Sequence, residues 1–239
     1  MGGGWSSPAV SNGVVYVGSY GDRVHALDAF TGGTLWTAET GGNNDSSPAV
    51  ADGFVYVGSN DHKVYAFDAT TGARVWTAPT GGEVFSSPAV FRGVVYVGSR
   101  NGNLHARDAK TGALLWTRYL EGGIESSPAV TREAVYIGTF RPLRGSGTGP
   151  HVFALDPDTG LTLWSEEAPN QVRSSPAVAN GIVYFIVKDR SLLGYDALTG
   201  DILWAGEDGN GERSSPAVTG GMVFGGITNE LGLLAYGLP

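Results

Sequence analysis

The pentapeptide Ser-Ser-Pro-Ala-Val constrains the fold of this chain more than any other feature, because it recurs six times in 239 residues. Its copies begin at residues 6, 46, 86, 126, 174 and 214, so their spacing is 40 residues except for one interval of 48. Residues 6–45 and 46–85 are identical at 23 of 40 positions. A repeat of this length and regularity indicates an architecture assembled from one structural unit.

One repeat unit has the pattern of a four-stranded β-meander. In residues 46–85, short β-branched and aromatic runs at 46–51, 54–59, 64–68 and around 74–77 are separated by Gly, Asn and Asp turns. No segment of the chain has sustained helical periodicity. We therefore predict an all-β β-propeller of six four-stranded blades of about 40 residues. The whole chain, 1–239, is predicted to be a single domain with blades at about 6–45, 46–85, 86–125, 126–173, 174–213 and 214–239.

The last blade is predicted to be incomplete. The sixth unit ends in its third strand and carries neither the turn motif nor the tryptophan of the other units. Two interpretations stay open: the blade has three strands, or its outer strand belongs to native sequence upstream of Met1. The second would leave an open edge here, and such edges invite strand pairing with another chain.

The proline of the pentapeptide indicates where its strand lies. Proline has no N–H to donate, so it is tolerated on an edge strand but not in a central one. Small residues such as Ser and Ala also suit strands that crowd around a propeller axis. We therefore predict that Ser-Ser-Pro-Ala-Val forms the innermost strand of each blade.

A second motif, Asp-x-x-Thr-Gly, is followed four residues later by tryptophan. The carboxylate and the hydroxyl can satisfy turn amides, and the glycine supplies a positive φ. One large aromatic side chain per unit suits packing between neighbouring blades. The structural residues predicted in this way are Asp28, Asp68, Asp108, Asp156, Asp196, Trp36, Trp76, Trp116, Trp164 and Trp204.

These residues also carry a resemblance to a known family. Residues 26–36 read Ala-Leu-Asp-Ala-Phe-Thr-Gly-Gly-Thr-Leu-Trp, and this pattern resembles the Trp-docking repeat of quinoprotein-type propellers, the PQQ-like (pyrroloquinoline quinone) repeat family. The resemblance covers nearly the whole chain and recurs in five units. It implies a propeller fold. The family contains quinone-dependent alcohol dehydrogenases, the periplasmic lipoprotein of the outer-membrane β-barrel assembly machinery, and repeats similar to sensor domains of bacterial Ser/Thr kinases.

The chain departs from the enzyme branch of this family. Those dehydrogenases are usually eight-bladed, much longer, and often carry an adjacent cysteine pair, whereas this chain has no cysteine. No position matches a catalytic aspartate or a calcium-ligand set. We therefore expect no catalytic residue, no metal and no cofactor; PQQ with calcium belongs only to an alternative, enzymatic interpretation.

Composition narrows the possible partners. A formal net charge of −8, without a basic stripe, argues against a nucleic-acid binder. No apolar run approaches membrane-spanning length. The resemblance favours an extracytoplasmic bacterial location: periplasmic, secreted or extracellular.

One face of the predicted propeller varies between repeats. The fourth-to-first and second-to-third connections lie on this face, and the residue before each Ser-Ser differs in every unit. A ring of these side chains around a channel mouth combines aromatic and charged groups, as ligand pockets do. The alternative is that they are freely varying, solvated loop positions. The predicted ring is Trp5, Asp45, Phe85, Glu125, Arg173 and Arg213, with loop contacts from Arg141, Arg144, His62 and Arg190.

Other candidate sites are weaker. His25 and His105 occupy the repeat position that holds Tyr65 in the second repeat, 46–85. This indicates packing rather than a shared metal ion. No residue is placed to act as a base for the repeated serines, so nucleophilic catalysis is unsupported.

The sequence therefore favours a non-catalytic scaffold or sensor module that binds a protein, a peptide or a small polar ligand on the variable face. The alternatives are a PQQ-dependent or other propeller enzyme, and an engineered or amplified repeat protein without a selected ligand.

Overall fold

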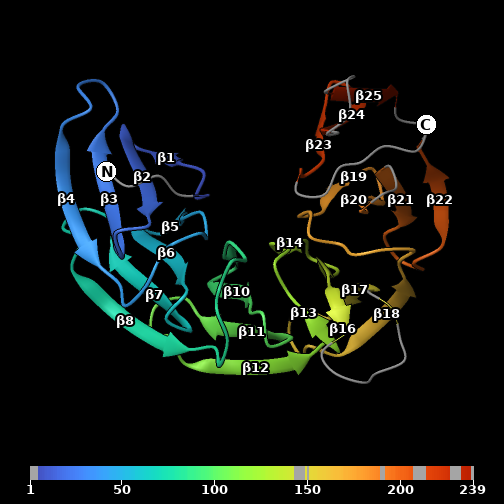
Figure 1. The fold of residues 1–239 in the computed structure, drawn as a ribbon, viewed down its shortest axis with the longest axis horizontal. Helices are drawn as coiled ribbons and strands as arrows, with labels where there is room; N and C mark the ends of the chain where they lie inside the picture. The colour runs from blue at the N-terminus through green and yellow to red at the C-terminus, as the bar shows by residue number, and fades with distance from the viewer. Residues whose placement is uncertain are drawn as a thin grey trace. The chain divides into compact units, whose positions relative to one another are not determined.

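A computed structural model describes residues 5–142, 149, 151–188, 192–206, 214–226 and 233–237. Every regular element in this part of the chain is a β-strand (Figure 1). The chain divides into two compact units, residues 1–119 and 120–239. That the whole chain forms one domain stays a prediction.

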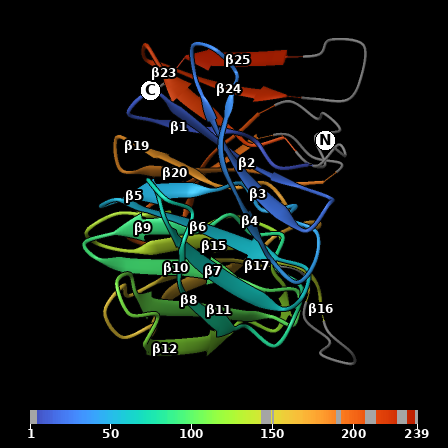
Figure 2. The ribbon, with the colours of Figure 1, turned by 90° about the vertical axis from the view of Figure 1, so that its left-hand side faces the viewer.

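The first unit contains three four-stranded antiparallel sheets in the orders β1-β2-β3-β4, β5-β6-β7-β8 and β9-β10-β11-β12. In Figure 2 they follow one another as successive layers. Their strands are β1 (Ala9–Ser11), β2 (Val14–Ser19), β3 (Arg23–Asp28), β4 (Thr34–Glu39), β5 (Ala49–Ala51), β6 (Phe54–Ser59), β7 (Lys63–Asp68), β8 (Arg74–Pro79), β9 (Ala89–Phe91), β10 (Val94–Gly98), β11 (Asn103–Asp108) and β12 (Leu114–Tyr119).

The second unit contains the sheets β14-β15-β17-β18, β19-β20-β21-β22 and β23-β24-β25, so the last sheet has three strands among the described residues. Their strands are β14 (Ala129–Val130), β15 (Val135–Gly138), β17 (His151–Leu155), β18 (Thr162–Glu167), β19 (Ala177–Ala179), β20 (Ile182–Ile186), β21 (Leu192–Asp196), β22 (Ile202–Ala205), β23 (Ala217–Thr219), β24 (Met222–Gly226) and β25 (Leu233–Gly237). A further two-stranded ribbon pairs β13 (Gly122–Gly123) with β16 (Phe140–Pro142), and the repeat pattern does not predict it.

The first strand of each sheet is shorter than predicted. In the second sheet, β5 begins at Ala49, after Pro48, and it lies at the edge of the sheet. The two preceding serines replace the missing ladder bonds with side-chain bonds. Ser46 Oγ accepts a hydrogen bond from the N–H of Gly58 at 3.0 Å, and Ser47 N–H donates to Ser87 Oγ of the next sheet at 2.9 Å.

This serine arrangement repeats along both units. The first serines Ser46, Ser86, Ser126 and Ser174 are buried, and each accepts a hydrogen bond from a backbone N–H of its own blade. The second serines link neighbouring blades: Ser7 N–H donates to Ser47 Oγ, Ser127 N–H to Ser175 Oγ, and Ser175 N–H to Ser215 Oγ, at 2.9–3.0 Å.

The Asp-x-x-Thr-Gly segments form tight, self-satisfied turns. Asp28 Oδ1 accepts hydrogen bonds from the N–H groups of Thr31 and Phe30 and from the Thr31 hydroxyl. These bonds, those from Thr31 foremost, lower the pKa of Asp28. Gly32 closes the turn with a φ of 70°, a backbone conformation that favours glycine.

The turns that begin at Asp68, Asp108 and Asp196 each receive the tryptophan of the preceding blade. Trp36 Nε1 donates to Ala69 O at 2.9 Å, and the Tyr16 hydroxyl donates to the same carbonyl at 3.2 Å. The indole lies directly against Gly72, where an added Cβ would meet it at 2.7 Å. Trp76 and Trp164 make the same bond to Ala109 O and Ala197 O. The hydrophobic core therefore lies between successive blades.

Candidate functional site

The variable positions of the first unit form an aromatic and acidic cluster. Trp5 is 62% exposed, and its ring centroid lies 6.4 Å from that of Phe85, two blades along the chain. The guanidinium of Arg100 lies 4.9 Å from the Phe85 ring centroid and 2.8 Å from a carboxylate oxygen of Glu83. An exposed tryptophan therefore stands beside a phenylalanine that an arginine covers.

Asp45 lies between these aromatic residues in the chain but is buried. Asn60 Nδ2 donates to Asp45 Oδ2 at 2.7 Å, which fixes the carboxylate against the β6–β7 loop. The pKa of Tyr20 is raised, mainly by loss of hydration and then by the nearby charge and hydrogen bond of Asp45. Asp45 thus anchors two neighbouring loops rather than standing free for a ligand.

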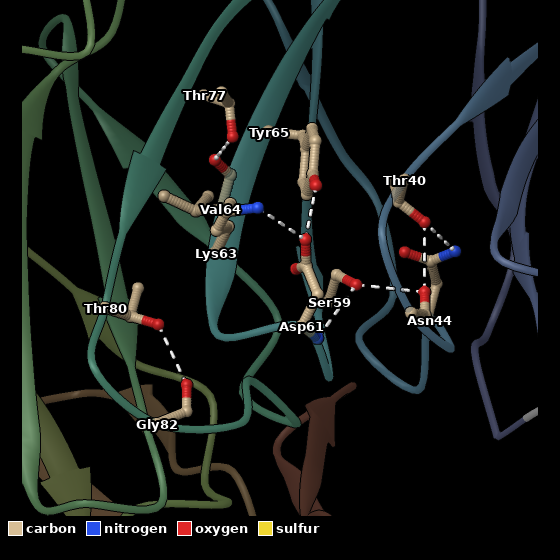
Figure 3. Close-up of polar contacts among 11 residues, drawn as sticks. Thr40, Asn44, Ser59, Asp61, Lys63, Val64, Tyr65, Thr77, Thr80 and Gly82 are labelled. Atoms are coloured by element: carbon tan, nitrogen blue, oxygen red, sulfur yellow. Dashed lines mark hydrogen bonds and ion pairs between the residues drawn. The ribbon is translucent and has the colours of Figure 1, made fainter.

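A polar network holds the β6–β7 loop that carries His62 (Figure 3). The Tyr65 hydroxyl donates to Asp61 Oδ2 at 2.5 Å, Lys63 Nζ lies 3.2 Å from the same oxygen, and Ser59 Oγ donates to Gly42 O at 2.9 Å. Burial alone would raise the pKa of Asp61, but hydrogen bonds led by that of Tyr65 lower it overall. These groups are occupied in shaping the loop, whereas the side chain of His62 is exposed.

The variable positions of the second unit form an ion pair. Arg173 Nε lies 3.6 Å from Glu125 Oε2, and both side chains are little exposed, at 13% and 11%. The Arg173 guanidinium also covers the ring of Phe140 at 4.8 Å from its centroid. Glu125 and Arg173, which the sequence places in one ring, therefore largely neutralise each other's charge. Phe140 of the ribbon strand β16 packs against the guanidinium.

The remaining predicted contacts are only partly described. Arg213, Arg144 and Arg190 lie outside the described residues, and Arg141 lies in β16 without a described side chain. Tyr20 and Arg100 stand in second-to-third loops whose variation between repeats marks the same face, although neither is among the predicted site residues. Phe140 has no signal of this kind, because it belongs to β16 in the one longer repeat.

Comparison with known proteins bears on the whole chain. A family model described as outer membrane protein assembly factor BamB matches residues 1–87, 60–147 and 143–231. The chain belongs to the PQQ-like repeat propeller family. The predicted all-β propeller of about six blades is thereby confirmed.

Solved propellers share the fold of this family member at low identity. BamB from Moraxella catarrhalis is 22% identical with a TM-score of 0.77, covering 99% of this chain and 76% of that one. The computationally designed Ika8 protein is 20% identical with a TM-score of 0.78, covering 98% and 70%. Quinohemoprotein alcohol dehydrogenase from Comamonas testosteroni is 21% identical with a TM-score of 0.74, covering 87% of this chain but 43% of the enzyme. No curated protein sequence matches the chain.

The family includes quinone enzymes, so the fit of PQQ and calcium requires a test against the residues present. Calcium takes six to eight oxygen ligands. Within the described ranges, no three His, Asp or Glu side chains gather where they could hold a metal ion. The repeated aspartates accept hydrogen bonds within their own turns, as Asp68 does from the N–H and the hydroxyl of Thr71. The described residues therefore do not fit the calcium ion that accompanies PQQ.

His25 and His105 are likewise committed to packing. His105 is 6% exposed, with Nδ1 3.0 Å from Thr117 Oγ1 and Nε2 3.1 Å from Thr80 O. His25 makes the equivalent contact with Thr37 in the first blade, at 3.2 Å. No described segment forms a helix that is long and apolar enough to cross a membrane.

Proposed function

We propose that this chain is a non-catalytic scaffold that binds an extended protein segment on its variable face. The observation that carries the proposal is the exposed aromatic cluster of the first unit, where Trp5 packs beside Phe85 and Arg100 covers that ring. Tryptophan, tyrosine and arginine are the residues that dominate binding energy at protein interfaces. Tyr20, 39% exposed, lies beside Asp45 of the same variable face.

The family relationship supports the class of partner. BamB is described as an outer membrane protein assembly factor, and a role of that kind requires contact with other polypeptides. By analogy we place this chain outside the bacterial cytoplasm, as a scaffold or as the sensor part of a longer protein. The outer edge of β25, which pairs only with β24 among the described strands, offers a second contact by strand addition.

Peptide display on the immobilised protein tests the scaffold role. We expect selected peptides whose affinity, measured by calorimetry, falls at least about tenfold in the variant Trp5→Ala with Phe85→Ala, because two ring contacts are lost. Leu115→Ala is the matched control, since it removes an exposed apolar side chain from β12, away from the cluster. Selected peptides that bind wild type and the double variant equally would refute the site.

The other two interpretations predict different results. A quinone enzyme would bind PQQ with calcium saturably and oxidise alcohols with a dye acceptor, and that outcome would replace the scaffold role. An amplified repeat protein without a selected ligand would yield no peptide that distinguishes wild type from the double variant.

A further inference from the structure

One position of the third strand holds a ring in four blades and an aliphatic side chain in the fifth. His25, Tyr65, His105 and Phe153 occupy this position in β3, β7, β11 and β17, whereas β21 has Leu193. The residue paired across the sheet changes too. It is a hydroxyl residue in the first four blades, namely Thr37, Thr77, Thr117 and Ser165, but Ala205 in the fifth.

In the first unit these rings fill the space between neighbouring blades. Tyr65 and His105 are only 3% and 6% exposed. The His105 ring extends from Thr117 to Thr80 O, in the loop that follows β8 of the preceding blade. Ring and hydroxyl together therefore close the gap between the outer strands of two blades.

In the second unit the equivalent space is an open cleft. It has a volume of about 450 Å³ and is lined by Leu193, Ile202 and Ala205 on one side and by Glu167, Ala168 and Pro169 on the other. Ala168 stands at the repeat position of Thr80, so the cleft lies where the His105 ring lies in the third blade. A volume in the range of about 300–1,000 Å³ is typical of small-ligand sites.

We propose that this cleft binds the aromatic ring of a small cationic ligand, of the arylalkylamine class. The ring takes the place that His, Tyr or Phe fills in the other blades, against the apolar walls of Leu193, Ile202 and Ala168. The ammonium group faces the acidic end of β18.

The negative charge beside the cleft favours a cationic ligand over an anionic one. Glu167, the last residue of β18, lines this cleft, its neighbour Glu166 precedes it in the strand, and none of the lining residues is a lysine or an arginine. The field of Glu166 reaches the interior of the fifth blade, where burial first and that carboxylate second raise the pKa of Tyr195 to about 12. An anionic ligand would meet the same carboxylates and be repelled.

Three probes separate the contribution of the ring from that of the charge. In calorimetric or NMR titrations of the whole chain, 2-phenylethylamine is expected to saturate one site. We expect 3-phenylpropionate, which keeps the ring but is anionic, and n-butylamine, which keeps the ammonium but lacks the ring, to bind at least about tenfold more weakly. Equal binding of the three probes, or no saturable binding of 2-phenylethylamine, would overturn the proposal.

Two filling variants locate the site. Leu193→Phe with Ala205→Ser reproduces the pair found in the fourth blade, and Ala168→Leu introduces the residue that stands at the equivalent position 120. Each is expected to weaken 2-phenylethylamine binding at least about tenfold, because the cleft is filled from opposite walls. The matched control Leu203→Phe adds the same ring to exposed β22 outside the lining and should bind like wild type.

The two filling variants also protect the test against a folding failure. They alter opposite walls of the cleft. If one variant fails to fold, the other still tests whether 2-phenylethylamine binds there. Unchanged binding in either folded variant would place the ligand elsewhere and refute the site.

Discussion

His105 is a buried base whose protonation opposes folding. Burial, only partly offset by the hydrogen bond to Thr80 and reinforced by Arg107, lowers its pKa from 6.5 to about 4. Since Thr80 O can only accept a hydrogen bond, Nε2 carries the hydrogen and Nδ1 accepts from Thr117. The neutral ring is therefore the form that the fold accommodates.

This pKa shift predicts a loss of stability on mild acidification. The unfolded chain takes up the proton near pH 6.5, before the folded chain does, so stability falls as the pH decreases from 6.5 toward 4. The loss between pH 7 and pH 5 is about 2 kcal/mol of the free energy of unfolding. Urea denaturation at both pH values measures it.

His105→Gln keeps a hydrogen-bond donor but does not titrate, so we expect most of this pH dependence to disappear in that variant. His62→Gln, which changes an exposed histidine, should retain the wild-type dependence. A wild-type slope in His105→Gln would assign the effect to other groups.

At the residue scale, the sequence located the variable positions but not their partners. It placed Trp5, Asp45 and Phe85 in one ring because the repeat fixes their register. It did not predict that Asp45 is buried against Asn60, since a loop's hydrogen bonds depend on the backbone path rather than on the period. The pairing of Glu125 with Arg173 was not predicted for the same reason.

At the element scale, the docked tryptophan makes a specific demand on the glycine of the next turn. Gly72 and Gly53 both have positive φ, 72° and 81°. An added Cβ at Gly72 would meet the Trp36 ring at 2.7 Å, whereas at Gly53 nothing lies within 4 Å. The two positions therefore share the backbone strain and differ only in the contact.

Alanine substitutions separate these two effects. Gly53→Ala is expected to cost about 1–2 kcal/mol from the left-handed backbone alone. Gly72→Ala should cost at least about 2 kcal/mol more, because the indole is displaced and its hydrogen bond to Ala69 O is strained. Urea denaturation of the two variants measures the difference, and equal costs would contradict a stabilising role for the docked indole.

Most strands were predictable from sequence because each repeat carries the same alternation and the same turn residues. Two elements depart for physical reasons. The first strands begin after their proline, which cannot donate to the ladder, as β5 shows. The ribbon of β13 and β16 arises where the 48-residue unit inserts extra chain, and an insertion has no second copy from which its pairing can be inferred.

At the scale of the whole molecule, the repeat argues for a single cooperative domain although the chain divides into two compact units. The division falls at residue 119, inside the predicted blade 86–125, and no linker-like segment interrupts the period there. In repeat architectures each structural repeat is stabilised by the repeats next to it, so a local loss of stability spreads along the chain.

Native-state hydrogen exchange tests this cooperativity. Gly72→Ala destabilises the first unit, and if unfolding is cooperative over the whole chain, amides of β20 in the second unit should exchange faster by the same free energy. A destabilisation of about 3 kcal/mol corresponds to exchange on the order of 100-fold faster. Gly53→Ala should accelerate β20 in proportion to its smaller cost. Unchanged exchange in β20, with faster exchange confined to β6, would instead establish two independent domains.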